Sequence, residues 1–466
     1  MTYQVPQHID SNKIFIVNRS EIESRLDPLY YGSDFTKFFK HPFSVRLKEV
    51  CINFSSGFGA GKSEQTTSDN GFVQIRPTNI DNDGFLKYEK KVYVPLHKGF
   101  PFVKKGTVLF NNTNSQEWVG KTALFLDETQ QYTSNHITSI IVDPNKLIAA
   151  YLWIILNVYQ RNKVFYSICT NWNNQSGVGI DLLQSVKVPI LPMSIQQEIV
   201  DNYMFAYREK QEREVEAQQL LESIDAYLFD ELSVSLPEVR KDLKDRMFFL
   251  DRSELEGRYD PTVYKDGIKL ISTKWDNVKL SKVAFVNPSG AYKGESIETP
   301  ISFVPMEVVD ERFSEIMTMG ETTIGQSSGF TKFREGDLLW AKITPCMQNG
   351  KSAVAKNLTN GLGCGSTEFF VLRPKDERLA IEYLHVILHM KCVRETAMLY
   401  FGGSAGQQRV SSSFLENFNL PLPPKEKQVE IAQHVYKMRQ QAKALQEEGK
   451  AILEQAKREV ERMIIG

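Results

Sequence analysis

One long unit occurs twice in this chain, and the duplication constrains the fold more than any other sequence feature. Asp27–Tyr30 (DPLY) returns as Asp260–Tyr264 (DPTVY) after 233 residues, and Gly120–Leu124 (GKTAL) returns as Gly350–Val354 (GKSAV) after 230. A period this long lies far outside the roughly 20–50 residues of solenoid repeats, so it predicts two tandem domains that do one thing at two places. Further pairs, all 228 to 233 residues apart, are Leu47 and Leu280, Val50 and Val283, Pro77 and Pro305, Phe85 and Phe313, Phe102 and Phe333, Gly106 and Gly336, Phe110 and Trp340, Pro189 and Pro421, Pro192 and Pro424, and Gln196 and Gln428.

The composition is that of an ordinary globular protein. Of the 466 residues, 41% are hydrophobic and 24% are charged, which lets each half bury a core. No run reaches the roughly 18 apolar residues of a membrane helix, and the first residues lack the pattern of a signal peptide. The five cysteines are widely spaced and form no C-x-x-C pair, which indicates reduced thiols and a cytoplasmic protein.

The net charge of −1 conceals an uneven distribution. Residues 1–193 contain 20 Lys and Arg against 16 Asp and Glu, a net charge of +4, whereas residues 194–231 contain 3 against 10, a net charge of −7. A mildly basic globular part is weak evidence for a nucleic-acid face, because many neutral domains show the same excess.

Each repeat divides into a mixed part and a long helix. The mixed parts, roughly residues 13–190 and 247–420, combine short β-rich runs, helical runs and Gly/Asn loops, and residues 194–233 and 425–464 each resemble one helix without internal proline. We expect a mixed α/β fold of two duplicated globular domains, separated by two long antiparallel coiled-coil helices and related by a pseudo-two-fold axis. The predicted runs are Phe43–Phe54, Val108–Asn111, Ala123–Leu126, Lys279–Val286, Leu338–Ile343 and Glu368–Leu372 as strands, and Lys146–Asn162 and Leu379–Met398 as helices.

Both long helices carry apolar residues at heptad spacing, although Lys210 and Arg213 interrupt the first stripe and Gly449 leaves a gap in the second. Such stripes can form an antiparallel coiled coil, and a helix of about 40 residues, about 60 Å long, outruns one small domain. The alternative is that each helix packs only on its own domain. The predicted seam residues are Ile199, Tyr203, Ala206, Ala217, Leu220, Ile224 and Leu228 in the first helix, and Ile431, Val435, Met438, Ala442, Leu445, Ile452, Ala456, Val460 and Met463 in the second.

Proline-bounded segments, Val188–Ser194 and Leu420–Pro424, precede the two helices. Proline fixes an extended approach and stops the preceding element. Ser194, followed by Gln197 three residues later, predicts a capping box at the start of the first helix.

Two sequence patterns suggest an enzyme, and neither is complete. Residues 56–63 (SGFGAGKS) lack only the first glycine of a phosphate-binding loop, but a polar loop rather than a helix follows them, and residues 287–294 do not repeat the pattern. Residues 287–290 (NPSG) lack the second proline and the aromatic residue of a methyltransferase pocket. The seven histidines form no metal-spaced pair, and no nucleophile–base pair occurs in both repeats. We expect no catalytic residue, metal or cofactor in this chain.

The loops that differ between the repeats are polar, and they are the candidate binding elements. Asn and Gln pair with adenine, whereas Arg and Lys pair with guanine, so divergent loops on a common frame would read two different short sequences. For any single residue, a turn-forming role is the competing interpretation. The candidate DNA-binding residues are Lys62, Ser63, Asn111, Asn112, Asn114, Gln116, Lys121, Asn173, Asn174 and Gln175 in the first repeat, and Lys293, Lys342, Thr344, Gln348, Asn349, Lys351, Gln407, Gln408 and Arg409 in the second.

This arrangement resembles the specificity (S) subunit of type I restriction–modification systems over nearly the whole chain. The residues that carry the resemblance are Pro189, Pro192, Gln197, Glu198 and Ile199 with Pro421, Pro424, Gln428, Glu430 and Ile431, the segments Phe102–Phe110 and Phe333–Trp340, and Gly406, Gln407, Phe414 and Leu415. The resemblance implies two target-recognition domains on double-stranded DNA, in complex with methyltransferase (modification) subunits, two in number, and restriction/translocase subunits. It also implies that S-adenosylmethionine, ATP and Mg²⁺ bind to those partners and not to this chain.

We therefore expect a first recognition domain at 1–190, a first helix at 191–235, a second domain with a short linker at 236–420 and a second helix at 421–466. Antiparallel helices would place the domains at opposite ends, where they could read half-sites about 34 Å apart on one face of a duplex. Two alternatives remain, a protein-interaction scaffold without DNA binding and a nucleotide-binding enzyme that uses the loop Ser56–Ser63.

Overall fold

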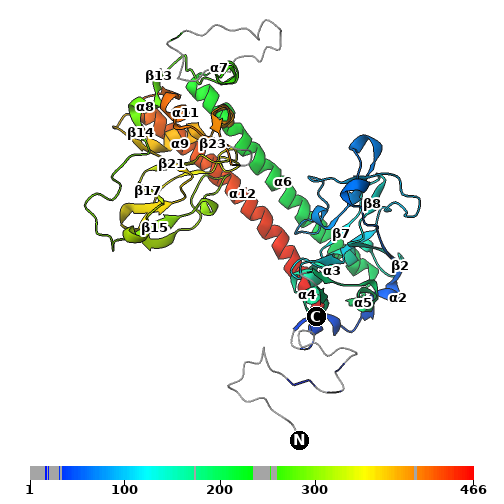
Figure 1. Ribbon diagram of the computed structural model, residues 1–466. Coiled ribbons are helices and arrows are strands. Elements are labelled where there is room, and N and C mark those ends of the chain that lie inside the picture. The colour runs from blue at the N-terminus through cyan, green and yellow to red at the C-terminus, as the bar shows by residue number, and fades with distance from the viewer. Residues whose placement is uncertain are drawn as a thin grey trace. The chain divides into compact units, whose positions relative to one another are not determined.

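The computed structural model describes residues 34–172, 175–234, 260–403 and 407–465, together with a few isolated residues nearer the N-terminus and in the central segment. The chain forms two compact units, Met1–Gln211 with Gly449–Gly466 (the first unit) and Glu212–Glu448 (the second unit). The long helices α6 (Met193–Leu232) and α12 (Lys425–Ile465), green and red in Figure 1, contribute to both units. The repeated Asp27–Tyr30 and the candidate residues Asn173 and Asn174 lie outside the described residues.

Each unit contains a four-stranded antiparallel sheet with the same strand order. In the first unit the order is β2-β9-β5-β7, and in the second it is β14-β21-β18-β19. The central strands are buried on both faces, with Val108 and Phe110 in one core and Leu109 in another. Successive side chains of a strand point to opposite faces, so this continuous apolar run marks a sheet covered on both sides. The strands are β2 (Cys51–Ser56), β9 (Ile137–Val142), β5 (Val108–Asn111), β7 (Thr122–Leu124), β14 (Ala284–Val286), β21 (Phe369–Pro374), β18 (Leu338–Ala341) and β19 (Ser352–Val354).

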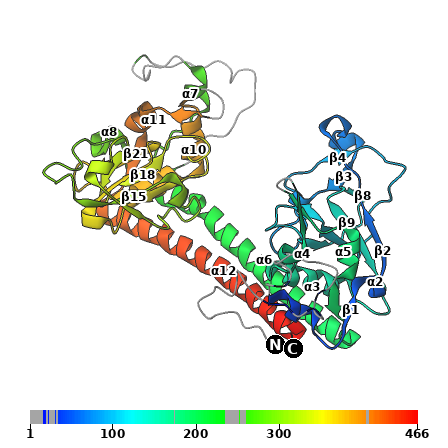
Figure 2. The ribbon, with the colours of Figure 1, turned by 60° about the horizontal axis from the view of Figure 1, so that its bottom comes forward.

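A second sheet lies in each unit and again shares its central pairing, with β3 parallel to β8 and β15 parallel to β20. The strands β3 and β8 can be followed in Figure 2. The second unit extends this sheet by β17, where the first unit has no strand at the equivalent Phe102. The strands are β4 (Tyr93–Val94), β3 (Phe72–Ile75), β8 (Gln131–Thr133), β16 (Gly320–Thr323), β15 (Pro300–Val304), β20 (Leu362–Gly365) and β17 (Thr331–Arg334).

In each unit, a pair of short strands joins an early segment of the globular part to the segment that precedes the long helix. These pairs are β1 (Ser44–Arg46) with β12 (Lys187–Pro189), and β13 (Asp276–Lys279) with β24 (Asn419–Leu422). The predicted strands Phe43–Phe54 and Lys279–Val286 are wrong in their centres, where one-turn helices α2 (Leu47–Val50) and α8 (Leu280–Val283) stand. The repeated Leu and Val are three residues apart, which is the spacing that buries both on one helical face.

Short helices cover the four-stranded sheets. The predicted helix Leu379–Met398 is two helices, because Met390 adopts an extended conformation (φ −52°, ψ 138°) between α9 and α10. The helices are α3 (Ala149–Arg161), α4 (Val164–Ile168), α5 (Ile180–Ser185), α7 (Pro261–Asp266), α9 (Ile381–His389), α10 (Lys391–Met398) and α11 (Ser412–Asn417). The remaining strands are β6 (Thr113–Asn114), β10 (Thr170–Trp172), β11 (Gln175–Gly177), β22 (Phe401–Gly402) and β23 (Arg409–Val410).

A duplicated glutamine fastens each long helix to its unit. Gln196 is fully buried; its Oε1 accepts from Ile148 N (2.9 Å), and its Nε2 donates to the carbonyls of Lys146 and Leu191. Gln428 repeats these bonds, accepting from Ala380 N (2.8 Å) and donating to the carbonyls of Arg378 and Pro423. Buried backbone groups need such partners, so the repeated glutamine has a structural role.

The long helices pack antiparallel within each unit, as predicted. In the first unit the start of α6, with Ile199 and Tyr203, shares a core with the end of α12, including Val460. In the second unit the end of α6, with Ile224 and Leu228, shares a core with the start of α12, including Ile431, Val435 and Met438. Leu220 and Ile452 are half-buried against these cores, and Leu445 is half-buried.

The end of the α12 stripe differs from the predicted register. Leu453 (1% exposed) and Ile464 (0%) are the core residues, whereas Met463 is 41% exposed and Ile452 is only half-buried. The gap at Gly449 has a steric cause, since a Cβ there would lie 3.2 Å from Lys210 Cα. Close helix contact therefore sets the register at this point.

The predicted capping box at Ser194 is wrong. The helix already begins at Met193, and the Gln197 side chain donates to Asp201 Oδ1 (2.8 Å), one turn further along the helix. Pro192 instead supplies the carbonyl that accepts from Ile195 N and Gln196 N.

Candidate nucleic-acid interface

The variable loops that the sequence singles out come together in both units. In the first unit the loop after β5 pairs with the hairpin β10–β11, with Asn114 opposite Ser176. In the second unit the loop after β18 meets the hairpin β22–β23, where Ile343 bridges to Arg409 and Thr344 N donates to the Gln408 carbonyl (3.0 Å). Loops far apart in the sequence thus form one polar surface on each frame.

In the first unit the loop after β2 joins this surface. Asn112 Nδ2 donates to the Asn135 carbonyl (3.2 Å) and to Thr138 Oγ1 (2.9 Å), and Phe58 bridges to Ser134. Gly59–Gly61, Gln74, Arg76 and residues 134–136 line a cavity of about 510 Å³ beside the loop. Lys62 and Ser63 are exposed on the same loop, in a short 3-10 turn. Arg76 therefore lines this cavity together with Glu64, and Lys62 lies on the loop beside it.

The same loop is poorly suited to a nucleotide phosphate. Phe58 N donates to the Thr133 carbonyl (3.2 Å), and Gly61 N donates to Glu64 Oε2 (2.8 Å). A phosphate-binding loop instead leaves such amides free at the start of a helix, and here only the turn Lys62–Glu64 follows. Gly57 is required for space, since a Cβ would lie 1.9 Å from the Thr133 carbonyl oxygen.

In the second unit, cations gather around the loop after β14. Residues 287–291, Lys332, Lys342 and Phe369 are among those that line a cavity of about 350 Å³. Arg334 Nε donates to the Ala291 carbonyl (2.7 Å) and holds this loop, on which Lys293 is exposed. Lys332 lies over the ring of Tyr292, 5.2 Å from its centroid. This basic surface corresponds to the one at Lys62 in the first unit.

Arg409 has an intramolecular partner. Its Nε and Nη2 donate to the two oxygens of Glu368 at 2.9 and 2.8 Å. The hydrogen bonds from Arg409 lower the pKa of the Glu368 carboxyl. A fork onto guanine would have to replace this ion pair, so Glu368 holds the guanidinium at the surface and competes for it.

Several predicted contact residues hold the frame instead. Asn111 is fully buried and donates to the Trp118 carbonyl (3.2 Å), so its amide is not available to a base and the predicted DNA contact at this residue is wrong. Lys121 Nζ donates to Asn82 Oδ1 (2.8 Å), and the equivalent Lys351 donates to the Met306 carbonyl (3.2 Å). Burial lowers the pKa of Lys121. Both repeated lysines thus donate hydrogen bonds within their own units, which accounts for their repetition without a DNA contact.

The remaining candidates divide by exposure. Gln175, Gln407 and Asn349 are exposed, although Asn349 Nδ2 donates to Glu311 (3.0 Å). The half-buried candidates are Asn112, Asn114, Gln116, Lys342, Thr344, Gln348 and Gln408, of which Gln116 donates to the Tyr166 carbonyl (3.0 Å). Their base or phosphate contacts stay predictions.

The sequence reading missed Arg76, Asn135, His136, Lys332 and Arg334. Arg76, Asn135 and His136 lie in no repeated motif and directly follow the parallel strands β3 and β8. Lys332 and Arg334 flank the repeated Phe333 on β17, which pairs antiparallel with β20. A sequence pattern alone does not reveal such long-range pairings. The alternation of polar and apolar residues around Arg334 was a sequence signal that could have indicated the strand β17.

Within the described part of the chain, no three His, Cys, Asp or Glu side chains gather as a metal site. None of the helices among these residues combines the length and apolar content that a membrane crossing needs.

Known proteins share both the sequence pattern and the fold. The chain is 38% identical over 164 residues to the type I restriction enzyme EcoEI specificity subunit of Escherichia coli, and 34% identical over 162 residues to the EcoAI specificity subunit of the same organism. Each alignment covers 34% of this chain and 26% of the relative, so the chain spans about a quarter of their length. A solved structure reported under the description of complex assembly and conformational transition of the type I R-M system has a similar fold, with a TM-score of 0.51 and 20% identity over 91% of this chain and 96% of that chain.

The family of the type I restriction modification DNA specificity domain matches the chain twice, at residues 44–220 and 274–455. The two matched regions coincide with the two duplicated frames and most of both long helices. The chain therefore belongs to the family of the type I restriction–modification DNA specificity domain.

Proposed function

We propose that this chain is the specificity subunit of a type I restriction–modification complex, and that each duplicated unit reads one half-site of a bipartite duplex DNA sequence. The observation that carries the proposal is that the family model matches both copies of the repeat. The two copies share the strand order of the four-stranded sheet, while their polar loops differ. A shared frame with divergent Asn, Gln, Lys and Arg loops supplies two different readers of base edges.

The chain itself would be non-catalytic in this role. Two methyltransferase (modification) subunits would bind S-adenosylmethionine, and restriction/translocase subunits would use ATP and Mg²⁺. The long helices would fix the spacer between half-sites and dock these partners. Exposed apolar side chains on α6, Phe205 (58%) and Val215 (56%), are consistent with partner contacts on the helices.

The rival readings fit the structure less well. A nucleotide-binding enzyme would need free amides in the loop Ser56–Ser63, where Phe58 N and Gly61 N are engaged. A scaffold without DNA binding would have no use for cations around the loops in both units.

Methylome sequencing tests the proposal directly. Cells that express the chain with its genomic neighbours should gain one methylated bipartite motif, and cells that lack only this chain should lose it. Identical methylation in both strains would overturn the proposal. Binding of the isolated chain to duplex DNA should also fall steeply with salt, whereas a scaffold would show no such binding.

A further inference from the structure

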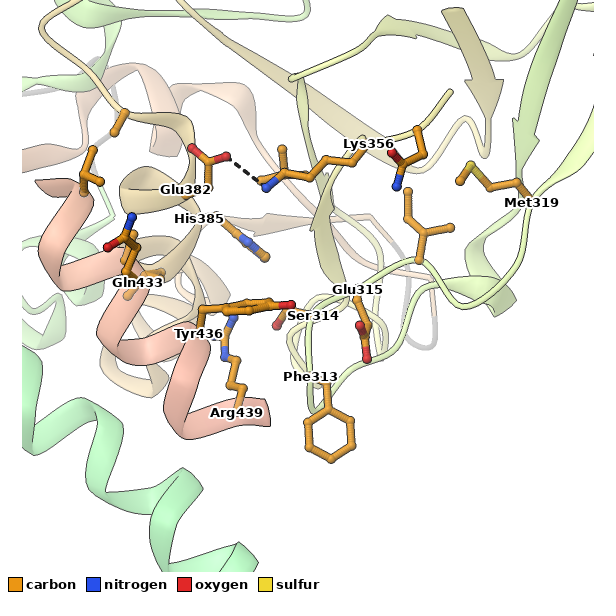
Figure 3. A pocket seen from close by; sticks show the side chains of 17 residues that line it. Phe313, Ser314, Glu315, Met319, Lys356, Glu382, His385, Gln433, Tyr436 and Arg439 are labelled. Atoms are coloured by element: carbon orange, nitrogen blue, oxygen red, sulfur yellow. Dashed lines mark ion pairs between the residues drawn. The ribbon is translucent and has the colours of Figure 1, made fainter. Parts of the chain in front are cut away.

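A cavity of about 620 Å³ in the second unit is not used by the proposed DNA interface. It lies among α12, α9 and the loops before β16 and after β19, and Figure 3 shows its lining side chains. Its volume falls in the range of small-molecule sites, about 300–1,000 Å³. Its walls are largely apolar, with Ile316, Met319, Val354, Val386 and Val429 among the lining residues.

A buried arginine lines the cavity without a full set of partners. Arg439 is only 5% exposed, and its Nε has no hydrogen-bond partner. A buried charged donor left unsatisfied is costly and calls for an explanation. Asp225 attracts the guanidinium electrostatically and Arg394 repels it, so these two neighbours act in opposite directions.

The carboxylates that line the cavity are already neutralised. Glu382 pairs with Lys356 (3.0 Å), as the dashed line in Figure 3 marks, and Glu315 pairs with Lys443. His385 is buried, and its Nε2 lies 3.1 Å from Ser352 Oγ. Burial, with the charge of Arg439, lowers the pKa of His385 to about 3, so its imidazole is neutral at neutral pH. Arg439 thus lacks a carboxylate partner among the residues that line the cavity, and the attraction from Asp225, which lies outside the lining, is opposed by Arg394.

The duplicated first unit provides an internal comparison, because it fills the same place with aromatic rings. By the offsets of the repeat, Arg439 corresponds to Tyr207, His385 to Trp153, and Phe313 to Phe85. Phe85 stacks on Tyr207 with centroids 3.4 Å apart and packs edge-on to Trp153 at 4.8 Å. The second unit therefore replaces two aromatic side chains of a packed core with a buried cation and an imidazole beside a cavity.

We propose that this cavity binds an organic monocarboxylate, with the carboxylate on the Arg439 guanidinium and an apolar body against Ile316 and Val386. The planar guanidinium matches a carboxylate in a two-bond fork. One cation without a carboxylate partner in the lining fits a single negative charge, whereas a dianionic phosphate would leave a second charge without a partner, since Lys356 and Lys443 are already paired with Glu382 and Glu315. The inference does not depend on DNA binding.

Calorimetric titration of the full chain with phenylacetate tests the site, with neutral phenylacetamide as the shape-matched control. Phenylacetate should bind with a stoichiometry of one, and phenylacetamide should not. Arg439→Met should weaken phenylacetate binding by roughly tenfold to a hundredfold, as expected for lost charge-assisted hydrogen bonds. Lys437→Met, which removes an exposed charge from the same helix, should leave the affinity unchanged.

Equal binding of the amide, unchanged binding to Arg439→Met, or no saturable binding of phenylacetate would overturn the proposal. If Arg439→Met does not fold, Val429→Trp serves instead, since Val429 is 38% exposed and lines the cavity. This variant should block phenylacetate, and unaltered affinity would count against the site.

The peptide Gly-Gly-Phe, with a free or an amidated C-terminus, identifies the source of the carboxylate. Tighter binding of the free peptide than of phenylacetate would assign the site to a protein chain end. Binding of phenylacetate without the free peptide would assign it to a small molecule.

Discussion

The two units share one hydrogen-bonded frame and differ in what they attach to it. Gln196 and Gln428, and Tyr151 and Tyr383, make equivalent bonds in their own units; the two tyrosine hydroxyls, for example, donate to the carbonyls of Pro189 and Pro421. The variable loops and the region around Arg439 instead carry different side chains. Duplication therefore preserved the frame, while the parts available to ligands changed.

The largest expected difference between the units concerns Asp337, whose counterpart is Thr107. Asp337 is 1% exposed and accepts two bonds of 2.7 Å from Arg373. Asp337→Ala would leave this cation unpaired and should destabilise the second unit by about 3 kcal/mol, while Thr107→Val should cost the first unit less than about 1 kcal/mol. Hydrogen exchange of β18 and β5 amides measures the loss of stability in each unit. Equal losses in the two units would contradict the stated asymmetry.

The glutamines should instead behave alike. Gln196→Leu and Gln428→Leu each leave one buried amide and two carbonyls without their partner. Each should cost its own unit about 2 kcal/mol, measured by hydrogen exchange at the start of α6 or α12. Costs that differ by more than about 1 kcal/mol would show that the shared geometry does not carry shared energetics.

These comparisons also mark what the sequence could predict. The helical runs 194–233 and 425–464 were predicted to within one residue of each end, because proline-bounded segments precede them and apolar heptads continue through them. The helix bounds 191–235 and 421–466 include those proline segments and begin two and four residues before the helices. The one-turn helices Leu47–Val50 and Leu280–Val283 differ from the predicted strands, because four residues are too few to display a helical period. Leu453, and not the predicted Ile452, is the core residue, because the close contact at Gly449 changes the register of the apolar stripe on α12.

The candidate interface was predictable as a set of loops and not as individual contacts. Divergence between repeats located the loops after β5 and β18, which the structure brings to the hairpins β10–β11 and β22–β23. Asn111 was misassigned, since the same amide that could read adenine here satisfies a buried carbonyl. Arg76 reaches the surface after the parallel pair β3–β8 and Lys332 on the antiparallel pair β17–β20, and no local pattern encodes either pairing.

A smaller effect should appear at acidic pH in the first unit. Asp83 accepts from Lys210 (2.5 Å) on α6 and Lys457 (2.8 Å) on α12. Burial raises its pKa, but the bonds from both lysines outweigh burial and leave the pKa below the ordinary value. A depressed carboxyl pKa stabilises the fold above the unfolded-state value and loses that contribution as the pH falls through the folded value.

The difference in thermal unfolding midpoint between the wild type and Asp83→Asn should therefore be constant above about pH 5 and shrink below about pH 4. Near neutral pH it should correspond to about 1 kcal/mol. Thermal unfolding followed by circular dichroism at several pH values measures this difference. A gap that widens on acidification would contradict the assignment to Asp83.

The smallest effect concerns one phosphate contact. Lys62→Ala should weaken binding to all duplex sequences about equally and lower the salt slope of binding by about one. Lys121→Ala should leave that slope unchanged, because Lys121 bonds to Asn82. Fluorescence anisotropy across a salt series distinguishes the two, and a reduced slope for Lys121→Ala would reopen its role as a DNA contact.

The central claim is that one frame presents two independent readers. Its most direct test exchanges residues 247–420 for the equivalent segment of another family member, followed by methylome sequencing of cells that carry the modification subunits. The account predicts a bipartite motif in which one half-site changes while the other half-site is retained. A motif in which both half-sites change, or neither does, would contradict it.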